Sequence, residues 1–165
     1  MTEAETPFEA PLRLHETEVQ PGWVDYNGHM SEAFYVLVFG HTTDAFLDLI
    51  GMDATFREQA SRSLYTLEAH VSYLREAAEA EPLGVETRLL DLDHKRVHLF
   101  HTMRHARSGE LLATGELMLL NVDSTGPHSA PFSDEVAARL QQIHRAHERL
   151  SWPEQAGRSI AIRRS

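Results

Sequence analysis

The longest apolar run of the chain extends from Ala33 to Phe39 and predicts a buried helix. Seven consecutive apolar residues cover every side of a helix, so we expect this helix to be enclosed on most sides. Ser31 and the acidic residue after it are typical of a helix start. Gly51 is typical of a helix stop, which places the expected helix at about residues 31–50.

After this helix, polar and apolar residues alternate with a period of two, as in strands with one buried face. Between Leu64 and Leu74 the expected apolar face consists of Tyr65, Leu67, Ala69, Val71 and Tyr73. Strands are also expected over residues 12–19, 85–92, 96–105 and 111–122, with turn signals at 91–95 and 107–110. A second helix is expected from Ser133, whose side chain suits an N-cap, to Leu150.

The order of these elements favours an α+β fold in a single domain spanning residues 1–165. The long apolar helix needs more than loops around it, and the apolar faces of the strands need a partner. A curved antiparallel sheet of about five strands that wraps around the helix satisfies both requirements. We expect residues 1–10 to be disordered and residues 151–165 to form a tail after the C-terminal helix.

The composition argues against several kinds of site and partner. The chain has no cysteine, which excludes a disulfide framework and a cysteine nucleophile and fits a cytoplasmic protein. Its formal charge of −10 disfavours a nucleic-acid partner, because phosphate backbones require a basic surface. No apolar stretch of 18 residues and no basic-then-apolar leader occurs, so we expect no membrane partner.

Eleven histidines raise the question of a metal site, but their spacing does not support one. His101 and His105 share a strand face yet lie roughly 13 Å apart, while His98 points to the opposite face. His144 and His147 are neighbours on a helix, but they supply two ligands without an evident third. We therefore expect no metal, and the absence of a glycine-rich phosphate loop leaves no motif for a cofactor.

A motif precedes the long helix: Asp25-Tyr26-Asn27-Gly28-His29-Met30. This motif resembles that of the acyl-CoA thioesterases of the 4-hydroxybenzoyl-CoA type, which have the hotdog fold. Segments 68–75 and 113–123 are similar to two strands of that family, so the resemblance covers about residues 12–123. The wider segment 23–30 looks closest to the thioesterases associated with carnitine dehydrogenase, which act on betainyl-CoA. One departure is that Ser31 and Glu32 stand where many members have asparagines.

The resemblance implies that Asp25 carries the chemistry of thioester hydrolysis. A carboxylate there can act as a general base or as a nucleophile, and the sequence leaves both routes open. The backbone N–H groups of Gly28, His29 and Met30, near a helix start, are candidate donors to the oxyanion. Gly28 has no side chain, so a thioester can approach it closely. The His29 side chain is expected to orient the loop or to bind the carbonyl oxygen.

Each of these residues also has a simpler interpretation. Asp25 can be a turn residue that bonds its own backbone, which is a common use of aspartate. Gly28 in an Asn-Gly pair is often only a turn residue, and a single histidine such as His29 is often only a structural hydrogen-bonding group. The resemblance favours the catalytic interpretation over the structural one.

The expected substrate is an acyl-CoA with a small polar acyl group, and betainyl-CoA is the leading candidate. The expected substrate-binding residues are Trp23, Tyr26, Asn27, Met30 and Tyr35. A trimethylammonium group is best held against aromatic faces, and Trp23, Tyr26, Phe34 and Tyr35 are aromatic. Phe34 and Tyr35 cannot both face the ligand, because adjacent residues diverge on a helix. The alternative is that these aromatics belong to the core or anchor the loop.

The contacts to CoA phosphate are left open by the sequence. The candidate cations, chosen by abundance alone, are Arg75, Lys95, Arg96, Arg104 and Arg107, and each is equally compatible with a solvated strand end. A small curved sheet leaves its edge strands unpaired, which together with the resemblance implies a homodimer, possibly a tetramer, with active sites between protomers.

Two other functions remain compatible with these residues. The first is a hotdog acyl-CoA hydratase or dehydratase, which usually places a histidine and an acidic residue over the acyl chain. The second is a non-catalytic module that binds acyl-CoA or another small ligand. The position of Asp25 before Gly28 and His29 favours the thioesterase.

Overall fold

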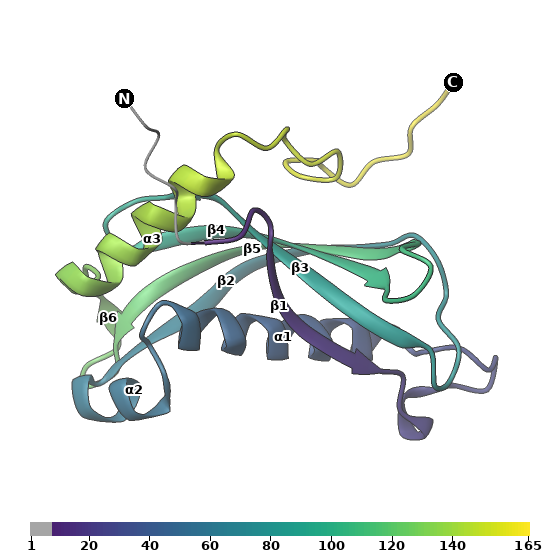
Figure 1. Cartoon of the computed structure of the whole chain (residues 1–165), viewed down its shortest axis with the longest axis horizontal. Coiled ribbons are helices and arrows are strands. Elements are labelled where there is room, and N and C mark those ends of the chain that lie inside the picture. Colours follow the sequence, from purple (N-terminus) through teal and green to yellow (C-terminus); the bar gives the residue numbers. More distant parts are fainter. Residues whose placement is uncertain (1–7) are drawn as a thin grey trace.

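The computed structural model describes residues 8–165 and contains a curved antiparallel sheet packed on a long helix (Figure 1). The strands are β1 (Leu12–Glu18), β2 (Arg62–Tyr73), β3 (Pro82–Leu92), β4 (Arg96–His105), β5 (Leu111–Asp123) and the two-residue β6 (His128–Ser129). Their order in the sheet is β1-β3-β4-β5-β2, and β6 pairs with β5. Helix α1 (Glu32–Leu49) lies along one face of the sheet, and α3 (Asp134–His147) lies on the other side. The expected α+β hotdog architecture is confirmed.

The sequence pattern missed the short elements. Helix α2 (Ala54–Ala60) follows α1, where only a polar connection was expected. The Asp53 carboxylate accepts the Phe56 N–H at 2.8 Å, which is an N-cap interaction, and Ser61 ends the helix in the left-handed conformation. A single 3-10 turn, η1 (Pro21–Trp23), precedes the segment of the Asp25 motif.

Strand β2 does not keep one apolar face along its whole length, contrary to the expected alternation. A β-bulge interrupts its pairing with β5, because Thr66 pairs with Leu119 and Glu68 with the next residue, Met118. Leu67 has no partner in this register and is 52% exposed. One extra residue reverses the facing of all later side chains. Tyr65 is therefore exposed, whereas Val71 packs into the core.

Helix α1 is buried only on the side that faces the sheet. Its buried residues are Tyr35, Val38, Phe39, Thr42, Phe46 and Leu47. On the opposite side, Val36 is 48% exposed and Leu37 is 39% exposed. The expectation that this helix is enclosed on most sides is thus wrong for the single chain, because the sheet curves around only one side of it.

Helix α3 covers the part of β3 that β1 leaves unpaired. The pairing of β1 with β3 begins at Leu12 and Thr87, so the residues of β3 after Thr87 have no partner in β1. The Leu89 N–H instead donates to Nδ1 of His147 at 2.9 Å. The Arg88 guanidinium donates to the carbonyl groups of His147, Leu150 and Ser151 near the end of α3.

The terminal segments were expected to be disordered or a simple tail. Residues 1–7, which are most of the segment expected to be disordered, lie outside the described residues. Phe8 packs against the core, and the Glu9 carbonyl accepts a hydrogen bond from His147. After α3 the chain crosses the outer face of the sheet, where both carboxylate oxygens of Glu116 lie within 3.1 Å of the Gly157 nitrogen.

Among residues 8–165, no single helix is long and apolar enough to cross a membrane. Only α1 and α2 taken together reach the required length and composition, and they meet at an angle of 70°.

Candidate active site

The Asp25 motif forms a tight hairpin just before α1. Val24 and Met30 pair across it, the Asp25 N–H donates to the His29 carbonyl at 3.0 Å, and the Gly28 N–H donates to the Asp25 carbonyl at 3.0 Å. Gly28 has a φ of +79°, a left-handed conformation that suits the last loop position of such hairpins. The Asp25 carboxylate accepts the Asn27 N–H at 2.8 Å, as the simpler interpretation predicted, and this bond stabilises the turn.

The two faces of this hairpin differ in chemistry. Val24 and Met30 pack into the core beside α1. Adjacent pairs in a hairpin point to opposite faces, and directly opposed residues share a face with Cβ atoms about 5 Å apart. The next pair, Asp25 and His29, therefore projects away from the core on a common face. The hairpin thus places the backbones of Asp25 and His29 opposite each other, with the carboxylate bonded to the Asn27 N–H and the imidazole beside Glu76.

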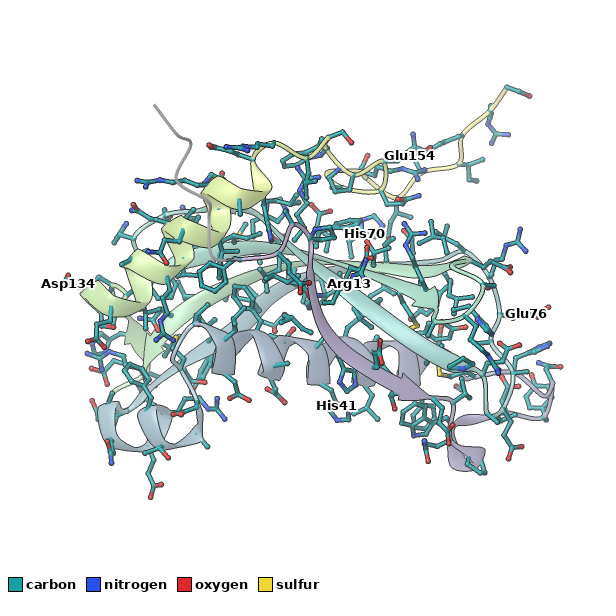
Figure 2. The ribbon with its side chains drawn as sticks, viewed as in Figure 1. Arg13, His41, His70, Glu76, Asp134 and Glu154 are labelled. Atoms are coloured by element: carbon teal, nitrogen blue, oxygen red, sulfur yellow. The ribbon has the colours of Figure 1, made fainter. Side chains whose placement is uncertain are left out.

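The loop after β2 lies against this hairpin and adds a residue that lies outside the Asp25 motif. Nδ1 of His29 lies 3.0 Å from Oε2 of Glu76, and these side chains are 38% and 71% exposed. The Met30 N–H donates to the Ala77 carbonyl at 2.8 Å, and His29 pairs with Ala78. Figure 2 shows Glu76 at the end of the molecule where α1 begins. No sequence motif marks Glu76, because two loops distant in sequence create the contact.

Only one of the three expected oxyanion donors has an unengaged N–H group. The N–H groups of Gly28 and Met30 donate to the carbonyls of Asp25 and Ala77. The His29 N–H has no protein acceptor among residues 8–165. Of the three expected backbone donors, only the His29 N–H is therefore available to an oxyanion, and His29 lies opposite Asp25 in the hairpin.

The expected substrate-binding residues fall into two groups. Trp23 stacks on Phe34 with ring centroids 5.7 Å apart, Tyr26 is 97% exposed, and Asn27 is also exposed on the hairpin. Met30 and Tyr35 lie in the core instead. The Tyr35 hydroxyl donates to the Arg75 carbonyl at 3.2 Å, and burial raises the pKa of this phenol. These two residues support the hairpin from inside the protein.

A hollow of about 760 Å³ runs between α1 and the inner faces of β2 and β5. Its lining includes the half-exposed Val36 and Leu37 of α1, together with Phe39 and Gly115. A Cβ atom at Gly115 would lie 2.9 Å from the Phe39 ring, so this ring packs directly against the glycine. The hollow lies beside the edge strand β2, where residues 8–165 provide no cover.

The five expected phosphate-binding cations are dispersed and mostly paired. Arg75 pairs with Glu110, Arg96 pairs with Asp93, and Arg104 lies 3.9 Å from Glu86. Lys95 lies 3.4 Å from the Ser129 hydroxyl, while Arg107 is exposed in the turn after β4. The structure therefore does not gather these side chains into one site. Among the described residues, no three histidine or acidic side chains are placed to hold a metal ion.

The chain is similar in sequence to known thioesterases. The family model described as thioesterase-like superfamily matches residues 19–140. The chain is 46% identical over 151 residues to a betainyl-CoA thioesterase of Pseudomonas aeruginosa, a match that covers 92% of this chain and 95% of that protein. It is 44% identical over 154 residues to an L-carnitine dehydrogenase/betainyl-CoA thioesterase of Rhizobium meliloti, covering 93% of this chain and 31% of that protein.

Two solved structures are similar over nearly the whole chain. A putative thioesterase of Pseudomonas putida is 40% identical with a TM-score of 0.82, and the match covers 94% of this chain and 99% of that one. A hypothetical protein of Staphylococcus aureus in complex with CoA is 29% identical with a TM-score of 0.87, and the match covers 94% and 98% of the two chains.

Proposed function

Because the chain belongs to the thioesterase-like superfamily and is a thioester hydrolase, we propose that it hydrolyses betainyl-CoA to the free acid and CoA. The observation that carries this proposal is the 46% identity to a betainyl-CoA thioesterase over 92% of this chain. The fusion of a similar domain to L-carnitine dehydrogenase in the Rhizobium meliloti protein supports a role in carnitine metabolism.

The hairpin supplies the groups that thioester hydrolysis requires. One oxygen of the Asp25 carboxylate accepts the Asn27 N–H, and that bond fixes the orientation of the carboxylate on the turn. The carboxylate then acts as the nucleophile on the thioester carbon or as the base that removes a proton from water. The His29 N–H, which lacks a protein acceptor among the described residues, is suited to receive the oxyanion of the tetrahedral intermediate.

The surroundings of the hairpin suit a cationic acyl group. Trp23 and Phe34 form a stacked aromatic surface at the start of α1. Aromatic faces attract a trimethylammonium group, which cannot form strong hydrogen bonds. The nearby carboxylates of Asp25, Glu32 and Glu76 also favour a cation over a neutral group.

We also propose that the working unit is a homodimer. Strand β2 is an edge of the sheet, and the hollow beside it is lined by half-exposed apolar residues of α1. An uncovered strand edge and a continuous apolar surface are both unfavourable in water. A second copy that pairs along β2 would cover both features and close the hollow between the two chains.

The substrate proposal is tested by thiol release from a set of acyl-CoA thioesters. The informative comparison is betainyl-CoA against the neutral analogue in which a tert-butyl group replaces the trimethylammonium. Cation–π contact predicts a preference of roughly 2- to 30-fold in kcat/KM for the cationic substrate. Equal kcat/KM values, or a clear preference for long fatty acyl chains, would exclude betainyl-CoA as the selected substrate.

A further inference from the structure

Glu76 makes the only described side-chain contact to the His29 ring, although it lies outside the Asp25 motif. Oε2 of Glu76 lies 3.0 Å from Nδ1 of His29, and a carboxylate oxygen at this distance favours a proton on Nδ1 over a lone pair there. In the neutral ring, Nε2 then carries a lone pair and accepts a proton rather than donating one. In this tautomer Nε2 of the ring cannot donate to a carbonyl oxygen, but it can serve as a base, while the backbone N–H of His29 remains a donor.

The contact between these side chains is set by the backbone. The Met30 N–H donates to the Ala77 carbonyl, and His29 pairs with Ala78, so the loop is held in register against the hairpin. Glu76 directly precedes the paired segment and therefore lies beside His29. The other acidic residues of the loop differ: Glu81 accepts the Ala78 N–H at 3.1 Å, and the Glu79 side chain is exposed without a partner among residues 8–165.

We propose that Glu76 is a positioning residue of the hydrolysis, which holds His29 so that Nε2 takes a proton from the attacking water. This inference rests on the proposed function and makes it specific. The Asp25 carboxylate attacks the thioester carbon, the C–S bond breaks, and CoA leaves as the thiolate, giving an acyl-Asp25 anhydride. His29 then removes a proton from water, whose oxygen attacks the anhydride. The C–O bond breaks to restore the Asp25 carboxylate and free the acid, and the imidazolium returns its proton to the solution.

This order of steps has a kinetic signature in the Glu76→Ala variant. His29 acts only in the second step, so acylation should keep its rate while hydrolysis of the anhydride slows. We expect kcat to fall roughly 10- to 100-fold, less than the loss of the base itself, with KM falling in parallel and kcat/KM nearly unchanged. Rapid mixing should show a burst of CoA thiol equal to the enzyme concentration, followed by slow turnover. Glu79→Ala, which removes a neighbouring exposed carboxylate, should behave as the wild type.

A second measurement does not depend on activity. Nitrogen NMR of the imidazoles, with the His29 signals assigned by their loss in His29→Asn, should show the Nδ1–H tautomer in the wild type. That tautomer should be lost in Glu76→Ala and retained in Glu79→Ala. Glu76→Gln keeps an acceptor oxygen for Nδ1–H and should restore part of the turnover.

Several results would overturn the inference. An unchanged His29 tautomer in Glu76→Ala would refute the positioning contact, and unchanged kcat would refute its role in hydrolysis. Equal losses in kcat and kcat/KM without a thiol burst would mean that Glu76 does not act in hydrolysis of the anhydride. The proposed thioesterase function would still stand in that case. A wild-type protein that releases no thiol from any acyl-CoA would instead refute the proposed function.

Discussion

His101 lies at the centre of the core with both ring nitrogens hydrogen-bonded. The Thr43 hydroxyl donates to the Phe39 carbonyl, so its oxygen accepts from Nε2–H of His101 at 2.9 Å. Nδ1 lies 2.8 Å from the Thr87 hydroxyl and is therefore the acceptor. The ring also stacks on Phe39, and burial lowers the pKa of His101 to about 3. The fold thus requires this histidine to be neutral.

The stability of the protein should consequently fall as the pH is lowered through the ordinary histidine range. The unfolded chain binds a proton at position 101 below about pH 6.5, whereas the folded protein does not until about pH 3. The contribution of neutral His101 to the free energy of unfolding is therefore complete above about pH 6.5, and it is lost as the pH falls. Urea unfolding should show about 2 kcal/mol less stability from this residue at pH 5 than at pH 7.5. His94→Gln, at an exposed turn, should retain that dependence, and a flat profile between the two pH values would mean that the fold does not require neutral His101.

Individual site residues were predictable only as far as local sequence reaches. The Asp25 motif and its Asn-Gly turn are contiguous, so the turn was expected from local sequence, whereas the pairing of the Asp25 and His29 backbones across it is seen only in the structure. Glu76 was not predictable, because it reaches His29 through the pairing of two loops. The position of Tyr35 was not predictable for the same reason, since its burial and its hydroxyl bond to the Arg75 carbonyl depend on the tertiary fold.

At the level of elements, periodicity located most strands and both long helices. Strand β4 has the expected bounds of Arg96–His105, and α3 begins at the expected cap, Ser133. The bulge at Leu67 escaped detection because its pairing with β5 is non-local, although it reverses the facing of the strand. Helix α2 had a local signal in the Asp53 cap that a stricter search for helix starts would have found.

Arg88 links two of these elements, and its removal should destabilise the protein. Its guanidinium donates to three carbonyl groups near the end of α3, and Arg88→Met removes these bonds and leaves the partly buried Leu150 carbonyl without this donor. We expect a loss of about 1–3 kcal/mol in the free energy of unfolding by urea. Arg145→Met, at an exposed position of α3, should change that free energy by less than about 0.5 kcal/mol. Equal stabilities of the two variants would show that the Arg88 contacts do not hold α3 in place.

At the scale of the whole molecule, the single chain leaves an apolar surface uncovered. The exposed side of α1 and the edge of β2 adjoin the same hollow. The helix was expected to be enclosed because of its all-round apolar sequence, and the chain itself covers only one side. The sequence pattern is therefore consistent with enclosure in an assembly rather than within one chain.

This interpretation predicts a dimer that a charge on the exposed side of α1 disrupts. Light scattering at micromolar concentration should give twice the mass of the 18.7 kDa chain for the wild type, or a higher multiple for a tetramer. Val36→Glu should shift the protein towards monomer, because it would bury a charge in the interface. Ile162→Glu, in the exposed tail, should leave the mass unchanged. A monomeric wild type with full thioesterase activity would refute the proposed assembly.

The Asp25→Asn variant shows whether the Asp25 carboxylate carries out thioester hydrolysis. The asparagine retains an acceptor oxygen for the Asn27 N–H, so the hairpin should survive while the base or nucleophile is lost. We expect turnover of betainyl-CoA to fall by about two to four orders of magnitude. The unfolding free energy should remain near that of the wild type, and Asp48→Asn, at an exposed position of α1, should keep full activity. Near-normal thiol release by folded Asp25→Asn would exclude this carboxylate as the nucleophile or base.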